Sequence, residues 1–484
     1  MTVEYLDVLI VGAGISGIGS GCHLQKKCPG KSFAILEGRQ SLGGTWDLFR
    51  YPGVRSDSDM YTLGYNFKPW NHAKAIADAP DILDYLRETV VENQLVEKIR
   101  YQHKVVSANW SDQNARWIVE VECGEPAEKR TLECGFLHMC SGYYNYAEGF
   151  TPEFNGRDSF KGQIVHPQFW PEDIDYAGKK VVIIGSGATA VTLVPAMAKT
   201  AEHVTMVQRS PSYLASRSAV DKTANRLRKL LPNKVAYFIT RWQNILAQRF
   251  VYNAFQRWPQ KSKEKLIERV TEQLGPDYDV GTHFTPNYNP WDQRLCLVPD
   301  NDMFDAISNG SASVVTDHID TFTERGLRLK SGEELDADII VTATGINMQF
   351  LSDIKLTVND KTLEPNKALS YKGLMVSDIP NMAISVGYTN ASWTLKCDLT
   401  CDYVCRLLNH MDKHGYTTCT PNTKNPDGKT DPYWNLTSGY VTRAAHLFPR
   451  QGTQEPWRLY QNYLKDIFML RYKPLDDGVL EFSS

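Results

Sequence analysis

The sequence has few cysteines, no long apolar run and almost no net charge. Ten cysteines among 484 residues are too sparse for a disulfide scaffold. No apolar run reaches the about 18 residues that a membrane-spanning helix needs, and no basic leader precedes an apolar core at the N-terminus. We therefore expect a cytoplasmic protein with free thiols and without a signal peptide.

Opposite charges nearly cancel, because 53 basic residues stand against 56 acidic ones. This balance excludes a chain-wide field that would attract nucleic acid. The apolar fraction of 42% and the charged fraction of 23% exclude a disordered or fibrous chain. At about 150 residues per domain, the length accommodates roughly three domains.

A dinucleotide-binding pattern begins close to the N-terminus. An apolar run over residues 6–11, typical of a buried strand, leads into Gly12, Gly14 and Gly17 and then into a helical pattern. These glycines allow a tight turn, a close approach of the backbone to a pyrophosphate and close packing of helix on strand. Glu37 lies 20 residues after Gly17, where a carboxylate accepts hydrogen bonds from ribose hydroxyls. This site is predicted to bind FAD or NAD.

The same pattern recurs in the middle of the chain. A buried-strand run over residues 180–184 precedes Gly185, Gly187 and Ala190, and a helical pattern follows. Arg209 takes the place of the ribose-binding acid, 19 residues after Ala190, where a guanidinium can grip a 2′-phosphate bidentately. The second site is therefore predicted to bind NADPH. Two such matches, each with its strand, helix and following residue, are a strong signal.

The two units predict an α/β fold with two Rossmann-like dinucleotide-binding domains. We expect the FAD-binding domain to be discontinuous and the NADPH-binding domain to contain a helical insertion. The expected boundaries are 1–145 and 370–484 for the FAD-binding domain, 146–215 and 292–369 for the NADPH-binding domain, and 216–291 for the insertion.

Two further motifs narrow the family. Gly44 and Trp46 lead into residues 51–53 (Tyr-Pro-Gly) and Asp57, which fit G-x-W-x4-Y-P-G-x3-D. Residues 160–171, FKGQIVHPQFWP, fit F-x-G-x3-H-x3-W-P. With these motifs the chain resembles the type I Baeyer–Villiger monooxygenases, FAD enzymes that use NADPH and O₂. It resembles their ethionamide-activating subgroup in particular, through residues 43–64, 289–299 and 386–396.

This resemblance implies conversion of ketones to esters or lactones through a C4a-peroxyflavin. Arg294 occupies the position of the family's catalytic arginine, whose permanent charge stabilises the anionic peroxide and the oxyanion of the adduct. Asp57 matches the carboxylate that pairs with this arginine. Gln293 departs from the family pattern, in which many members have a lysine that helps to hold NADPH, so more of the 2′-phosphate recognition falls to Arg209.

The motifs and the resemblance together assign a set of site residues. The catalytic pair is Arg294 and Asp57. No metal site is expected, because the chain has no Cys-x2-Cys pair. The residues expected to contact the cofactors are Gly12, Gly14, Ser16, Gly17, Glu37, Gly44, Thr45, Trp46, Asp47, Leu48, Arg55, Ser56, Asp57, Val105, Gly185, Ser186, Gly187, Ala188, Thr189, Ala190, Gln208 and Arg209.

Three aromatic or imidazole side chains have expected roles outside the chemistry. His166 and Trp170 lie between the predicted domains, where we expect them to couple NADPH binding to domain position rather than to transfer protons. Trp393 either lines the substrate pocket or packs in the core.

Two other functions stay open. One is a sulfur or nitrogen monooxygenase that acts on thioethers, thioamides or amines through the hydroperoxyflavin, and the resembled subgroup performs both reactions. The other is a non-catalytic nucleotide-bound sensor, which would consume no NADPH. A flavin disulfide reductase is disfavoured, because residues 43–59 contain no cysteine.

Residues 222–269 carry twelve Lys and Arg but two acidic residues, interleaved with aromatics at helical spacing. Three interpretations compete for this segment: a solvated basic face, an anchor on an anionic membrane surface, and a wall of the substrate tunnel. The expected partners are a small-molecule ketone or sulfur compound and O₂, with no nucleic acid and no obligate protein partner. Peripheral association with the inner membrane face depends on the second interpretation.

Overall fold

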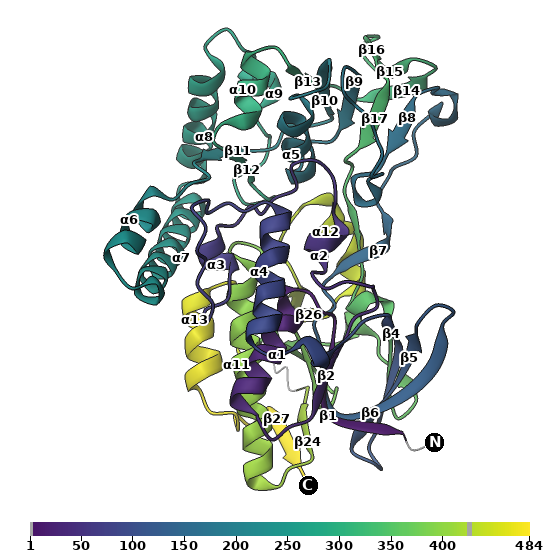
Figure 1. Ribbon diagram of the computed structural model, residues 1–484, viewed down its shortest axis with the longest axis vertical. Helices are drawn as coiled ribbons and strands as arrows, with labels where there is room; N and C mark the ends of the chain where they lie inside the picture. Colours follow the sequence, from purple (N-terminus) through teal and green to yellow (C-terminus); the bar gives the residue numbers. More distant parts are fainter. Residues whose placement is uncertain (1–2, 424–427) are drawn as a thin grey trace.

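The computed structural model describes residues 3–423 and 428–484. Its first large sheet has nine strands within the described residues, in the order β20-β19-β4-β5-β6-β1-β2-β3 with β23 also beside β6. Figure 1 labels β1, β2, β4, β5 and β6 of this sheet. These strands are β1 Glu4–Val11, β2 Phe33–Leu36, β3 Ile99–Arg100, β4 His103–Ser111, β5 Arg116–Cys123, β6 Glu128–Met139, β19 Lys355–Val358, β20 Lys361–Thr362 and β23 Met382–Ile384.

The burial of these strands follows their pairing. β2 is a continuous apolar run that is buried throughout and pairs in parallel with β1, as expected of a strand covered on both faces. β5 alternates buried and more exposed side chains along an antiparallel meander with β4 and β6. β6 changes partner along its length: residues 128–134 pair with β5, and residues 137–139 pair in parallel with β23.

The second large sheet is parallel throughout. Its order is β13-β10-β9-β17-β8, formed by β8 Gln163–Val165, β9 Lys180–Ile184, β10 His203–Gln208, β13 Ala312–Thr316 and β17 Ile339–Thr342. A small antiparallel sheet of β14 Ile319–Thr323, β15 Gly326–Leu329 and β16 Glu334–Asp336 follows β13.

Each large sheet contains the predicted strand–glycine–helix unit. Helix α1, Ile15–Lys27, starts directly after β1 and its glycine turn, and α5, Ala188–Met197, starts directly after β9. The predicted fold class, two Rossmann-like folds in one chain, is confirmed. The remaining helices around the first sheet are α2 Thr45–Leu48, α3 Met60–Leu63, α4 Ala79–Glu92, α11 Trp393–His414, α12 Gly439–Ala444 and α13 Tyr463–Ile467.

The insertion is helical, as predicted. It consists of α6 Lys222–Leu230, α7 Asn233–Arg257, α8 Pro259–Leu274 and α9 Val280–His283, and α10 Asp302–Ser308 follows in the second fold. In Figure 1, α6 and α7 project from one side of the molecule, and α7 also contacts α3 of the first fold. The insertion therefore touches both folds.

The chain crosses between the two large sheets through a pair of antiparallel strands. β7, Tyr144–Gly149, carries the chain out of the first fold, and β18, Ile346–Met348, carries it back. β19 at 355–358 pairs with β4 of the first sheet, ahead of the boundary expected at residue 370. Because β19 is only four residues long, no signal of that pairing was visible in the sequence.

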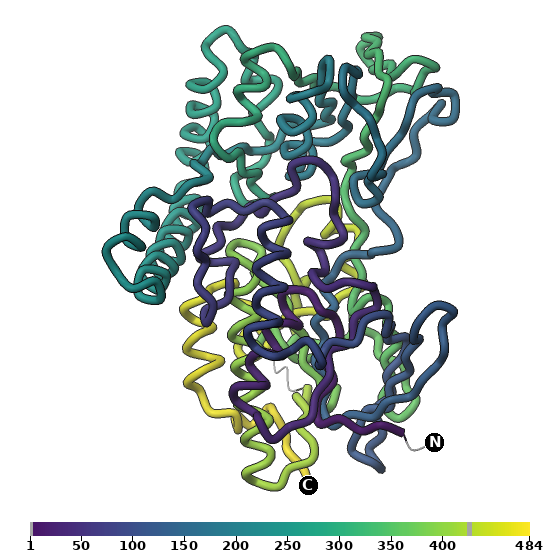
Figure 2. The backbone as a smooth tube through the Cα atoms, in the orientation of Figure 1, coloured from purple at the N-terminus to yellow at the C-terminus, as the bar shows by residue number. Residues whose placement is uncertain are grey.

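The other described strands form two-stranded sheets. They are β11 Leu214–Arg217 with β12 Cys296–Pro299, β21 Ser370–Tyr371 with β22 Met375–Val376, β24 Thr418–Pro421 with β27 Leu480–Ser483, and β25 Thr430–Pro432 with β26 Arg450–Gly452. Figure 2 shows that the two ends of the chain lie at the same pole, on the first fold. Cys397, Cys401 and Cys405 on α11 are buried free thiols, and no group of three or more metal-ligating side chains occurs among the described residues.

Candidate active site

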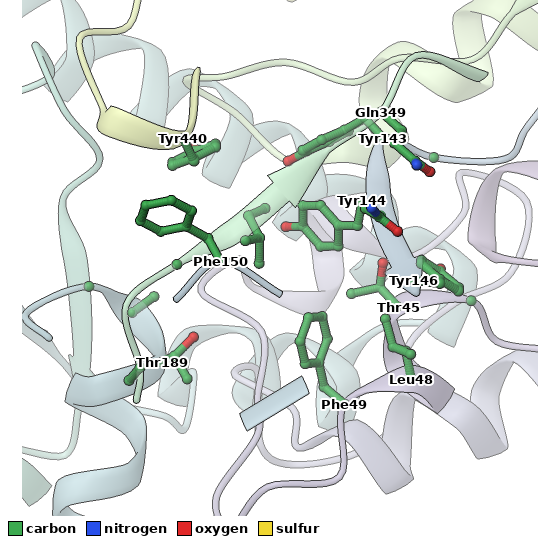
Figure 3. A pocket seen from close by; sticks show the side chains of 18 of the residues that line it. Thr45, Leu48, Phe49, Tyr143, Tyr144, Tyr146, Phe150, Thr189, Gln349 and Tyr440 are labelled. Atoms are coloured by element: carbon green, nitrogen blue, oxygen red, sulfur yellow. The ribbon is translucent and has the colours of Figure 1, made fainter. Parts of the chain in front are cut away.

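A cleft of about 1450 Å³ lies between the two folds. Its lining comes from both glycine turns, from the segments after β2 and β6, from residues 293–296, and from α12. Figure 3 shows the aromatic part of this lining. Among the described residues that line it, none comes from the insertion at 216–291, so the interpretation of the insertion as a tunnel wall is not supported.

The first glycine turn opens the N-terminus of α1 toward the cleft. Gly12 has φ +101°, and a Cβ there would lie 2.7 Å from the carbonyl oxygen of Cys140. A Cβ on Gly17 would lie 1.8 Å from the carbonyl oxygen of Gly12, so helix and strand pack too closely for any side chain. Gly14, in contrast, has no neighbour nearer than Gly44 at 3.6 Å and faces the cleft. The free amides at this helix start are suited to an anionic group.

Glu37 is held in place by the same turn. Its Oε2 accepts a hydrogen bond from the Ala13 amide at 2.8 Å, and its Oε1 accepts one from the Arg39 amide at 2.9 Å. Burial raises the pKa of Glu37, although both amides oppose that rise. A carboxylate has about four acceptor positions, so two remain for hydroxyl groups in the cleft.

The second turn repeats the arrangement. Gly185 has φ +143°, and a Cβ there would lie 2.3 Å from the carbonyl oxygen of Ala343, whereas a Cβ on Gly187 would meet nothing within 4 Å. Arg209 follows β10 and lines the cleft with its side chain exposed. Close by, the Ser186 hydroxyl donates to the Ser210 carbonyl at 3.0 Å. This region offers a cation, hydroxyl groups and a helix N-terminus to a phosphate.

Arg294 and Asp57 face the same cleft from different folds. Both side chains have exposed surface, but that surface faces the cleft, and the protein around the cleft displaces part of the surrounding water. Burial therefore raises the pKa of Asp57, against the opposing effects of Arg294 and Arg55. Within the described chain, Asp57 and Arg294 form no ion pair within 4.0 Å, so Asp57 acts on Arg294 across the cleft and not by direct contact.

A wall of tyrosines surrounds Arg294, and the sequence motifs did not predict it. Tyr143 and Tyr144 follow β6, and Tyr440 lies on α12 (Figure 3). The Tyr143 and Tyr144 rings meet edge to face at 4.6 Å, and Phe49 packs on Tyr144 at 6.0 Å. Burial opposes charge on Arg294, but the tyrosines and Asp57 outweigh that cost and raise the pKa of Arg294. The side chain therefore stays a cation.

Most of the predicted cofactor contacts line the cleft, although one of them serves a second purpose. Arg55 lines the cleft and also forms an ion pair with Asp302 at the start of α10, which ties the first fold to the second. The lining residues are Gly12, Gly14, Ser16, Glu37, Gly44, Thr45, Trp46, Leu48, Arg55, Ser56, Asp57, Val105, Gly185, Ser186, Gly187, Ala188, Thr189 and Arg209.

Four predicted contacts do not line the cleft. Gly17 and Ala190 pack their helices onto the sheets. The Asp47 carboxylate forms ion pairs with Arg39, at 2.9 Å, and with Arg50. The Gln208 amide donates to the His283 carbonyl at 2.7 Å and to Thr316 at 2.9 Å. These four residues lie beneath the lining of the cleft and hold it in place. Sequence spacing alone does not distinguish them from residues that face the cleft.

The remaining expectations concern His166, Trp170 and Trp393. His166 packs against the crossing strands, since a Cβ on Gly149 would lie 2.1 Å from its ring, and Trp170 packs on the core of the second fold. Trp393 begins α11, lines the cleft and donates from Nε1 to the Ser16 hydroxyl at 2.9 Å. Trp393 thus joins the glycine turn to the cleft wall.

Comparison with known sequences identifies relatives along the whole chain. A family model described as FMO-like, flavin-binding monooxygenase-like, matches residues 7–388. The chain is 52% identical over 481 residues to the FAD-containing monooxygenase EthA of Mycobacterium tuberculosis, covering 99% of this chain and 98% of that protein. It is also 52% identical over 481 residues to the probable FAD-binding monooxygenase AlmA of Acinetobacter baylyi, covering 99% and 96%.

Comparison with solved structures identifies the same fold. A steroid monooxygenase bound to NADP superposes with a TM-score of 0.77 at 22% identity, over 99% of this chain and 100% of that one. A cyclohexanone monooxygenase bound to ε-caprolactone gives 0.76 at 18% identity over the same shares. The predicted resemblance is confirmed at the level of the family. The chain belongs to the flavin-binding monooxygenase-like family.

Proposed function

We propose that this protein is an FAD- and NADPH-dependent Baeyer–Villiger monooxygenase that converts ketones to esters or lactones. The observation that carries the proposal is the position of Arg294, a permanent cation in the one cleft onto which both glycine turns open. The EthA and AlmA relatives, named as FAD-containing or FAD-binding monooxygenases, and the NADP-bound steroid monooxygenase support the choice of cofactors.

The residues of the cleft fit both cofactors. A Cβ at Gly14 or Gly187 would have open space around it, so a pyrophosphate can approach each backbone. Glu37 retains acceptor positions for the ribose of FAD. Arg209 and Ser186 both line the cleft beside the second glycine turn and offer a cation and a hydroxyl group to the 2′-phosphate of NADPH. When bound, FAD reduced by NADPH activates O₂ and supplies the oxygen atom that enters the product.

The chain's own contribution to the reaction is electrostatic. Arg294 presents a fixed positive charge, which would stabilise the negative charge that develops on a ketone oxygen when its carbon is attacked. An arginine suits this role because it stays protonated at any working pH. Asp57 and the three tyrosines lie near that charge and raise the pKa of Arg294, which favours its charged form.

Sulfur oxygenation is the second candidate. The aromatic wall formed by Phe49, Tyr144 and Phe150 favours it, because a thioether sulfur packs well against aromatic rings. This reaction adds an oxygen atom to sulfur without creating a carbonyl oxyanion, so it depends less on Arg294.

A product assay with two substrates tests the proposal. The purified protein, loaded with FAD and supplied with NADPH and O₂, is given a ketone or a thioether, and ester and sulfoxide are measured by gas chromatography. We expect Arg294→Ala to lower the rate of ester formation about 10²–10³-fold, the cost of removing one such charged donor, and to lower sulfoxide formation less.

The matched control is Arg325→Ala, an exposed arginine of the second fold that pairs with Asp336; we expect it to leave both rates unchanged. The flavin absorbance of each variant verifies that FAD is bound. Ester formation by Arg294→Ala within threefold of the wild type would refute the assigned role. If the FAD-loaded protein consumes no NADPH in the presence of O₂, with or without these substrates, the protein is instead a nucleotide-bound sensor.

A further inference from the structure

Helix α7 of the insertion exposes a continuous apolar face. The side chains that form it are Val235, Phe238, Ile239, Leu246 and Phe250, which we call the insertion patch. Phe238 is 61% exposed and Phe250 is 73% exposed. Val235 precedes Phe238 and Ile239 by three and four residues, Leu246 follows Ile239 by seven, and Phe250 follows Leu246 by four, so the five side chains lie along one side of the helix. The opposite side of α7 is buried against the molecule.

The surroundings of the patch extend the apolar surface. Leu230 at the end of α6 is 79% exposed. Helix α13 lies against α7, where the rings of Trp242 and Tyr463 are 6.2 Å apart, and Figure 1 shows α6, α7 and α13 along the same side of the molecule. The π-helix Phe468–Tyr472, which continues α13, adds exposed Phe468 and Tyr472. Apolar surfaces of this extent on a folded protein mark an interaction site.

The chain segment that carries the patch has charges of one sign along its length. Residues 222–263 contain ten Lys and Arg and no Asp or Glu, and of the ten only Arg241 is buried among the described residues. A solvated basic face would not need exposed phenylalanines. A second copy of the chain would bring an equally basic surface against this one and be repelled. Aromatic and aliphatic side chains set among Lys and Arg are the composition of helices that lie in a membrane interface.

We propose that the insertion patch docks on an anionic membrane surface, with α7 lying flat on the bilayer. At 1.5 Å per residue the helix is about 37 Å long, and Phe238 and Phe250 would enter the headgroup region while Lys229 and Lys234 contact anionic lipid. None of the described helices is long and apolar enough to cross a membrane, so the contact is peripheral. It is independent of the reaction proposed above, because the patch does not line the cleft.

Vesicle co-sedimentation of the full-length holoenzyme tests this. Vesicles of 30% phosphatidylglycerol in phosphatidylcholine should sediment the protein at low salt and release most of it at 0.5 M NaCl, whereas pure phosphatidylcholine should bind little. Each basic residue near an anionic bilayer contributes roughly a fivefold change in binding. We expect Lys229→Glu with Lys234→Glu to weaken binding at least 30-fold, and Phe238→Glu with Phe250→Glu to weaken it about 100-fold.

Two matched controls separate this site from general surface effects. Lys129→Glu with Lys361→Glu changes the net charge equally on the first sheet, and Val91→Glu replaces a residue of α4 that is 66% exposed. Both controls should bind vesicles like the wild type, and all variants should keep the wild-type rate of NADPH consumption with a water-soluble substrate.

Three results would overturn the proposal. The first is no binding to anionic vesicles at low salt. The second is binding that the phenylalanine variant leaves unchanged. The third is a concentration-dependent dimer in sedimentation velocity that the same variant abolishes, which would assign the patch to a second copy of the chain.

Discussion

Arg241 should anchor the insertion to the segment that carries Asp57. It lies on the buried side of α7 with 4% of its surface exposed. Its Nη1 donates to the carbonyls of Tyr61 and Gly64, each at 2.7 Å, and its Nη2 lies 3.4 Å from an Asp398 carboxylate oxygen. These contacts join α7 to α3 and to α11.

Arg241→Met keeps most of the side-chain volume but removes every one of these hydrogen bonds. Breaking a buried ion pair from one side costs about 3–5 kcal/mol. The Asp398 carboxylate keeps contacts to His23 at 3.4 Å and to the Asn66 amide at 3.1 Å, so the lower end applies. We therefore expect a loss of about 3 kcal/mol, which corresponds to about 6–12 °C in Tm for a cooperative unit of about 250 residues.

Differential scanning fluorimetry and denaturant titration of the FAD-loaded protein measure this loss. Arg257→Met is the matched control, because it makes the same change on the same helix at an exposed position, where substitutions cost within about 0.5 kcal/mol. If Arg241→Met and Arg257→Met unfold within 1 kcal/mol of each other, the buried guanidinium does not hold the insertion in place.

Three further predictions concern the cofactor sites and pH. Glu37→Gln places an amide opposite two backbone donors, so FAD retention on dialysis should fall about 10–100-fold, by about 1.5–3 kcal/mol; unchanged retention would contradict the role of Glu37. Arg209→Ala should lower the kcat/KM preference for NADPH over NADH about 30-fold, by about 2 kcal/mol, and an unaltered preference would move 2′-phosphate recognition elsewhere. His138 is fully buried between Ser20 and Ser385, and burial, assisted by His23, lowers its pKa to about 3. In the unfolded chain a histidine takes up a proton near pH 6.5. The free energy of unfolding therefore keeps its full value above that pH and decreases as the pH falls toward 3, by about 2 kcal/mol at pH 5. Urea titrations of His138→Gln should show a smaller decrease than those of the wild type.

The parts of the fold that were predictable depend on local backbone geometry. The glycine turns at 12–17 and 185–190 were predictable because only glycine tolerates the contacts that Gly17 and Gly185 make. The pairing of β19 with β4 was not predictable. It joins residues 248 positions apart, and β19 is a short segment with no distinctive pattern.

The site shows the same division. Arg294 and Asp57 could be proposed from the sequence because they belong to recognisable motifs, and both line the cleft. The tyrosine wall was missed, because Tyr143 and Tyr440 are about 300 residues apart in sequence and meet only in the folded cleft. The run Tyr143-Tyr144-Asn145-Tyr146, shortly after a strand that ends at the cleft, was the available signal. The sequence also showed that the insertion is basic. It did not show that Phe238 is exposed, because exposure depends on what packs against α7.

The change of partner along β6 has a consequence for folding during synthesis. The C-terminal end of β6 cannot pair with β23 until β23 has been synthesised. β23 begins at Met382, 243 residues after Met139. At about 5–20 residues per second this delay lasts roughly 10–50 s. Meanwhile every strand of the second sheet, residues 163–342, leaves the ribosome. The second fold can therefore assemble first, while the end of β6 beside the cleft stays an open sheet edge. Such an edge can pair with other chains, so this stretch of the nascent chain is at risk of aggregation.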